Sequence, residues 1–113
     1  MLSIKDKGLL LLIIDYCSRI NEKINTSSKE DFMDNRDLQE IICFNIFQIG
    51  ELAKSFSTNF IAEYDKISWK SVKGMRDKIG HGYSSIDLEI VYETAKKDII
   101  ALQEYCKKII EIK

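Results

Sequence analysis

Apolar residues recur along this chain at intervals of three and four, the period of an amphipathic α-helix, and no segment sustains the alternation of a β-strand. The pattern predicts long helices over residues 4–24, 35–56 and 88–110, a shorter helix over 68–79, and a short helical or irregular connection over 58–66. Because the connections are short, we expect an all-α, up-and-down bundle of four to five helices in a single domain, residues 1–113.

Polar residues at the predicted helix starts support these boundaries. Ser3 with Asp6, and Ser28 with Asp31, have the spacing of a capping box, in which two side chains satisfy free N–H groups reciprocally. Asp87 precedes the last predicted helix as its N-cap.

The first predicted helix is apolar around more of its circumference than one neighbour could cover. Residues that widen its main stripe are Leu10, Leu11, Leu12 and Ile14. We therefore expect this helix to be central in the bundle or shared with another subunit. Asn45 falls on the apolar stripe of the helix over 35–56, and we interpret it as a buried amide that fixes the register.

Composition and charge narrow the classes of function. Lysine and arginine number 17 against 18 acidic residues, so any anion-binding site must be local. The longest apolar run, LLLLII at residues 9–14, is too short to cross a bilayer and lacks a cleavage site after it. Three scattered cysteines favour buried free thiols in a reducing compartment. We expect a cytoplasmic protein with no metal, no cofactor, no glycine-rich phosphate loop and no membrane contact.

The one concentrated basic segment spans residues 66–78, which contain four lysines and one arginine but only one acidic residue, Asp77. Its lysines are our candidates for contact with RNA phosphates: Lys66, Lys70, Lys73 and Lys78. Arg76 supplies a planar cation that can hold a phosphate by two hydrogen bonds. The alternative interpretation is that these lysines form only a solvated helix face.

His81 is the only histidine, and it lies between Gly80 and Gly82, five residues after Arg76. Asp77 would face it over one helical turn, hold the imidazole in one tautomer and raise its pKa. A proton carrier, a phosphate clamp and local positive charge suit cleavage of RNA by attack of its 2′-hydroxyl, a route that needs no metal. Spacing alone leaves open a histidine that merely contacts the last carbonyls of a helix.

Full efficiency in this reaction requires both a base and an acid, and each chain has one histidine. A two-fold homodimer would bring two histidines and two arginines together. The broad apolar surface of the first helix gives such a dimer a reason to form.

Two segments, ISWKSVKGMRDKIGHGYSSID at residues 67–87 and IFQIGELAKSFS at residues 46–57, closely resemble the recurrent motifs of the HepT-like family in the HEPN superfamily. The family pattern is a tryptophan, then Gly-Met-Arg, four residues, His-x-Tyr and Ile-Asp. Here the order and the spacing of these residues match.

The resemblance implies a HEPN-like helical-bundle homodimer that acts as the ribonuclease toxin of a type VII-like toxin–antitoxin pair, with an R-x4-H-x-Y motif at the dimer cleft. Its antitoxin would be a small MntA-like nucleotidyltransferase that transfers AMP to the motif tyrosine. Carried onto this chain, Arg76 is the phosphate clamp, His81 the general acid or base, and Tyr83 the acceptor of AMP. A half-buried ring beside the cleft is the alternative role of Tyr83.

Three residues depart from the family pattern. Asp77 stands where asparagine is more common, so it can orient His81 but adds negative charge beside the RNA phosphate. Ser68 replaces a proline before Trp69 and can serve as an N-cap. Gly80 replaces a bulkier apolar residue, which should loosen the turn that carries His81.

Two side chains near these motifs have plainer interpretations. We interpret Trp69 as a core anchor rather than a platform for bases, and Glu51 as a solvated side chain although it could approach the cleft. The alternative function for the whole chain is a non-catalytic, substrate-binding partner module of a nucleotidyltransferase.

Overall fold

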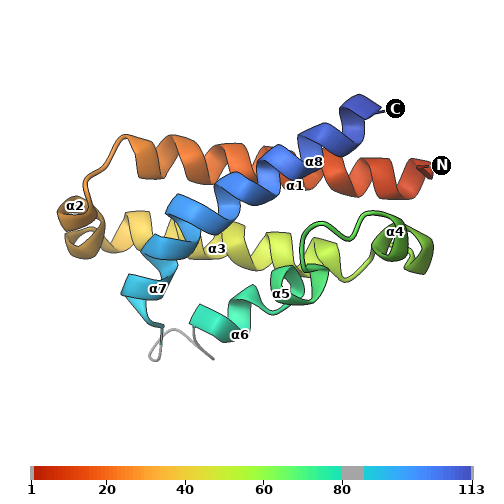
Figure 1. Cartoon of the computed structure of the whole chain (residues 1–113). Helices are drawn as coiled ribbons and strands as arrows, with labels where there is room; N and C mark the ends of the chain where they lie inside the picture. The colour runs from red at the N-terminus through yellow and green to blue at the C-terminus, as the bar shows by residue number, and fades with distance from the viewer. Residues whose placement is uncertain (1, 80–85, 113) are drawn as a thin grey trace.

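The computed structural model describes residues 2–79 and 86–112, and every regular element in these ranges is a helix. The elements are α1 (Ile4–Asn25), α2 (Lys29–Asp34), α3 (Arg36–Ala53), α4 (Thr58–Glu63), α5 (Trp69–Lys73), α6 (Met75–Ile79), α7 (Leu88–Glu93), the π-helical segment η2 (Thr94–Asp98) and α8 (Ile99–Ile112). Long helices lie side by side and the two chain ends are at the same end of the molecule (Figure 1). The predicted all-α bundle is confirmed.

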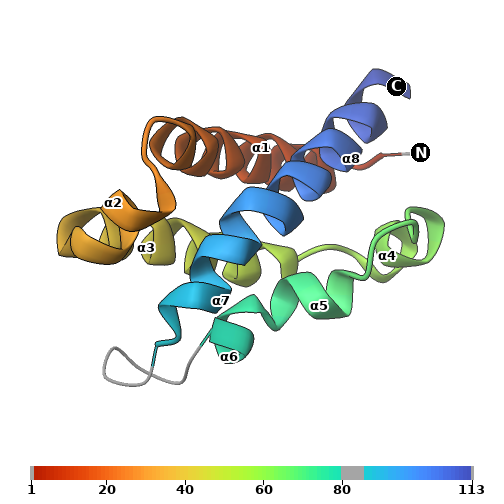
Figure 2. The ribbon, with the colours of Figure 1, turned by 60° about the vertical axis from the view of Figure 1, so that its left-hand side comes forward.

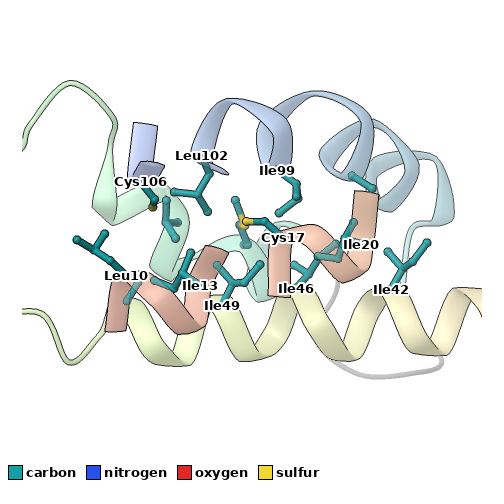
Figure 3. Close-up of a cluster of buried hydrophobic side chains, with 14 of the residues drawn as sticks. Leu10, Ile13, Cys17, Ile20, Ile42, Ile46, Ile49, Ile99, Leu102 and Cys106 are labelled. Carbon is teal, nitrogen blue, oxygen red and sulfur yellow. The ribbon is translucent and has the colours of Figure 1, made fainter. Parts of the chain in front are cut away.

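The core forms where α1 packs against both α3 and α8. Figure 3 shows its buried side chains, Leu10, Ile13, Cys17, Ile20, Ile42, Ile46, Ile49, Ile99, Leu102 and Cys106. Burying one such aliphatic side chain contributes about 1.5–3 kcal/mol. The expected central place of the first helix is therefore confirmed, yet Leu11 and Leu12 stay 50% and 48% exposed. In the part of the chain that the structure describes, no helix is long and apolar enough to span a membrane.

The helix caps are those that the sequence predicted, except that the Asp6 carboxylate bonds elsewhere. The predicted capping box of Ser28 and Asp31 is present in both directions. Ser3 also caps α1 by accepting from the Asp6 N–H at 3.0 Å. The Asp6 carboxylate, however, accepts from the Ser57 N–H at 3.0 Å and from its hydroxyl at 2.6 Å. Burial alone would raise the pKa of Asp6, but these bonds from Ser57 lower it overall. The Asp6 carboxylate thus ties α1 to the start of α4.

A second polar link joins α1 and α8. Gln103 donates to the Ser18 hydroxyl at 2.7 Å, and Asn21 donates to the Gln103 carbonyl oxygen at 2.8 Å. Asn45, which we expected to fix the register, is buried but donates to the carbonyl of Ile41 in its own helix at 2.9 Å. Buried polar groups need hydrogen-bond partners. The hydrogen bonds of Gln103 join α8 to α1, whereas that of Asn45 lies within α3.

The last predicted helix is confirmed as an unbroken helical run from α7 through η2 to α8, capped by Asp87. Its π-helical middle was not predicted. The Ile99 N–H there bonds to the carbonyl of Thr94, five residues earlier. Such π segments occur mostly as single turns within α-helices.

The helix expected over residues 68–79 is not continuous, so that prediction is wrong. It divides at Gly74, which has φ −90° and ψ 5° and ends α5 by donating to the carbonyl of Lys70 at 3.0 Å. The helix predicted over 35–56 also ends earlier, at Ala53. Lysines before Gly74 and Arg76 after it therefore do not share the face of one straight helix.

Candidate functional site

A close contact between α3 and α5 places the basic segment. A Cβ atom added at Gly50 would lie 3.4 Å from the carbonyl oxygens of Val72 and Lys73. Because Gly50 has no side chain, the end of α5 can approach α3 closely. The chain then turns at Gly74 and places α6 beside α3 (Figure 2).

Replacing Gly50 with leucine is expected to lower the free energy of unfolding by about 1–3 kcal/mol, because its branches would push the α5 carbonyls away. Gly50→Ala should stay within about 1 kcal/mol, since a helical alanine is itself favourable. Gly8 is the matched control: it also lies inside a helix, but a Cβ there would meet nothing within 4 Å. Urea unfolding measures the effect, and equal stability of Gly50→Leu and Gly8→Leu would contradict the close approach.

Arg76 lies over α3. Its guanidinium carbon is 5.5 Å from the centre of the Phe47 ring. One turn further along α3, Glu51 accepts from Lys54 at 2.7 Å; this hydrogen bond and the charge of Lys54 lower the pKa of Glu51, with a smaller contribution from the charge of Arg76. Within residues 2–79 and 86–112, Arg76 has no ion pair of its own. In this part of the chain, its guanidinium therefore contacts an aromatic ring rather than a carboxylate.

The other predicted site residues of the basic segment are exposed, but they differ in their contacts. The side chain of Lys78 donates to Asp98 at 3.3 Å, which links α6 to the end of η2. The remaining residues of the set are also exposed: Lys66, Lys70, Lys73 and Asp77. Lys78 is thus partly neutralised, so we expect it to contribute less to RNA binding than the other lysines.

His81 and Tyr83, together with Gly80 and Gly82, lie outside the described residues. The expected contact between Asp77 and His81 therefore stays a prediction. The elements that precede and follow this segment, α6 and α7, both contact α3 and each other. The described residues on either side of the motif segment therefore lie against the same helix, α3.

Trp69 is the core anchor that the sequence predicted. It is 3% exposed, donates from Nε1 to the carbonyl of Tyr64 at 2.6 Å, and packs against the rings of Phe56 and Phe60. Ser68 caps α5 by accepting from the Ser71 N–H at 3.2 Å, as expected. These contacts hold α5 in place just before Arg76.

The three thiols are free and buried, as predicted. Burial raises the pKa of Cys43 to about 11 and that of Cys106 to about 12, which makes both poor nucleophiles and poor metal ligands at neutral pH. Among the residues described, no three His, Cys, Asp or Glu side chains gather closely enough to hold a metal ion.

Large apolar side chains are exposed on both α1 and α3. Phe44 and Ile41 on α3 are 58% and 42% exposed, and they line a shallow depression with Arg19 of α1. Leu12 lies two turns before Arg19 on the same stripe of α1. We call Leu12, Ile41 and Phe44 the apolar face. Phe44 precedes Phe47 by three residues, so the face continues toward Arg76. The sequence indicated surplus apolar surface on α1 but gave no sign that Ile41 and Phe44 of α3 are exposed as well.

Comparison with known proteins identifies relatives over most of the chain. The model of the family described as "Ribonuclease HepT-like" matches residues 13–109. "Putative RNase" of Caldanaerobacter subterraneus subsp. tengcongensis is 31% identical over 88% of both chains. "Gamma-glutamylcyclotransferase and putative RNase" of Methanocaldococcus jannaschii is 33% identical over 88% of this chain but only 45% of its own length. "Probable ribonuclease HepT" of Thermococcus cleftensis is 30% identical over 71% of this chain and 73% of its own length. No solved structure shows a significant match.

Proposed function

Because the chain belongs to the ribonuclease HepT-like family, we propose that it is a metal-independent endoribonuclease. The observation that carries the proposal is the set of contacts that the Arg76 side chain makes. Its guanidinium rests on an aromatic ring without a carboxylate partner in the described residues, at the first position of the R-x4-H-x-Y motif. A cation that is held in place and not neutralised is what a phosphate clamp requires.

The reaction that we assign to this site is cleavage by transfer within the RNA. His81 removes the proton from a 2′-hydroxyl, the freed oxygen attacks the adjacent phosphorus, and the bond to the 5′-oxygen breaks. The leaving oxygen takes a proton, so the products are a 2′,3′-cyclic phosphate and a 5′-hydroxyl. Arg76 stabilises the charge of the pentacovalent transition state, and Asp77 orients His81. The exposed lysines Lys66, Lys70 and Lys73 bind neighbouring phosphates.

A homodimer would complete this site. One histidine cannot serve as base and acid at the same moment, and two-fold symmetry supplies a second one. The apolar face next to Arg76 is the surface through which we propose that two copies associate. Isolated exposed apolar residues are ordinary on proteins, but Ile41 and Phe44 line one depression with Arg19, and Leu12 is exposed on the stripe of α1 that carries Arg19.

We further propose that the protein is the toxin of a toxin–antitoxin pair whose antitoxin is an MntA-like nucleotidyltransferase. Transfer of AMP from ATP to the Tyr83 hydroxyl releases pyrophosphate and leaves a phosphodiester two residues from His81. The bulk and negative charge of this group would repel an RNA phosphate from Arg76.

Intact-mass spectrometry, with peptide mapping over residues 71–85, tests this assignment. Protein co-expressed with the nucleotidyltransferase is expected to carry one or more AMP groups on Tyr83, whereas protein expressed alone or the variant Tyr83→Phe should carry none there. The unmodified form should cleave RNA in the presence of EDTA, and the modified form should not. Stable co-purification with neither an adduct nor RNA cleavage would favour a non-catalytic partner module of the nucleotidyltransferase.

A further inference from the structure

We propose that Phe47 is a positioning residue for Arg76: its ring holds the guanidinium where the RNA phosphate binds. This inference rests on the proposed ribonuclease function. The contact on which it depends joins two elements that are distant in sequence, since Phe47 is in the middle of α3 and Arg76 is on the short helix α6.

Phe47 is anchored more firmly than the side chain that it would position. It is half-buried and packs against the hydrophobic core, on a helix of 18 residues whose opposite side carries Ile42, Ile46 and Ile49. Arg76 is exposed on a helix of five residues. A long side chain on so short an element would otherwise sample many rotamers, and ordering it on RNA binding would cost entropy. The ring reduces this cost before RNA arrives.

An aromatic ring suits this purpose better than a carboxylate does. The ring attracts a cation through its quadrupole, yet it neither cancels the positive charge nor occupies the N–H groups in the guanidinium plane. Lys78 shows the contrast, because its ammonium group is paired with Asp98. The charge of Arg76 contributes to lowering the pKa of Glu51, but that carboxylate is hydrogen-bonded to Lys54, which offsets its negative charge. Against the described residues, Arg76 therefore keeps both its charge and its N–H donors for a phosphate.

A comparison of Phe47 variants tests the inference. Phe47→Leu keeps an apolar side chain but removes the ring, and it should lower kcat/KM for a short RNA by about threefold to tenfold. Phe47→Tyr keeps the ring and should retain the activity. In an Arg76→Ala background, Phe47→Leu should have no further effect, because the ring acts only through the guanidinium. A loss of the same size in both backgrounds would overturn the inference.

The contact can also be measured without any enzymatic activity. In the ¹⁵N–¹H NMR spectrum, the Nε–Hε signal of Arg76 should show a ring-current shift that Phe47→Tyr keeps and Phe47→Leu removes. Phe47→Met is a second ringless variant should the leucine variant fold poorly, and size-exclusion chromatography checks that each variant keeps the oligomeric state of the wild type. An Arg76 signal that does not move in either ringless variant would overturn the inference.

These measurements separate the two hypotheses. If no cleavage depends on His81, the proposed function fails, while the NMR signal still reports whether the ring holds Arg76. If cleavage depends on His81 but both ringless variants are fully active, the function stands and the role of Phe47 is wrong.

Discussion

Replacing His81 with alanine is expected to lower the rate of RNA cleavage by about 100- to 10,000-fold, the usual contribution of a positioned acid or base. The protein has no other histidine that could take over the proton transfer. If the protein is a toxin as proposed, growth inhibition on its expression should disappear together with cleavage. Binding of the proposed nucleotidyltransferase partner should persist, because the mechanism uses the imidazole for chemistry and not for docking. The direct measurement is cleavage of a labelled RNA in EDTA at several pH values.

Variants of the neighbouring charges serve as controls for this result. Arg76→Ala should cause a loss of similar order, whereas Arg36→Ala, which removes the same charge from an exposed ion pair with Glu40, should leave cleavage almost unchanged. Asp77→Asn should raise kcat/KM modestly, because it removes a negative charge beside the phosphate. Full activity of His81→Ala, with a fold that melts at the wild-type temperature, would rule out the mechanism proposed here.

The sequence predicted those parts of the fold that depend on local interactions. Ser28 and Asp31 are three residues apart, and the capping box that they form needs nothing from the rest of the chain. Asp6 has the same local spacing to Ser3, but its carboxylate found a better partner in Ser57, 51 residues away. A tertiary contact of this kind leaves no mark on the local pattern. The break at Gly74 was missed for a related reason: a glycine inside a helical pattern costs only about 1 kcal/mol, and the local pattern does not show that the end of α5 lies against Gly50.

The candidate site, like the fold, was predictable only where it depends on residues that are close in sequence. The motif identified Arg76 because its spacing to His81 and Tyr83 is a property of one continuous segment. The partners that set the environment of the segment come from elsewhere: Phe47 from α3, and Asp98 from the end of η2. No periodicity links these positions to the motif. Only the packing of α6 between α3 and the C-terminal helical run brings them together.

The second large effect that we expect comes from disrupting the proposed association through the apolar face. Glutamate in place of Leu12 or Phe44 is expected to convert the proposed homodimer into a monomer and to reduce RNA cleavage at least about 100-fold, because a single histidine then has to act without its symmetry mate. Burying an unpaired carboxylate between two copies costs several kcal/mol, enough to dissociate a dimer of ordinary affinity. Stability of the monomer should change by no more than about 0.5 kcal/mol, since both positions are exposed in the single chain.

Leu11 provides a matched control in the adjacent position. It is 50% exposed, against 48% for Leu12, so the two substitutions add the same charge at nearly equal exposure. Leu11 belongs to a different stripe of α1, the one that continues to Ser18, whose hydroxyl accepts from Gln103 of α8. Leu11→Glu should therefore leave both the dimer and the cleavage intact. Light scattering after size-exclusion chromatography measures the mass of each variant. A dimer that survives Leu12→Glu and Phe44→Glu but dissociates with Leu11→Glu would place the interface on the α8 side of α1, away from Arg76, and two copies could not then share one active site.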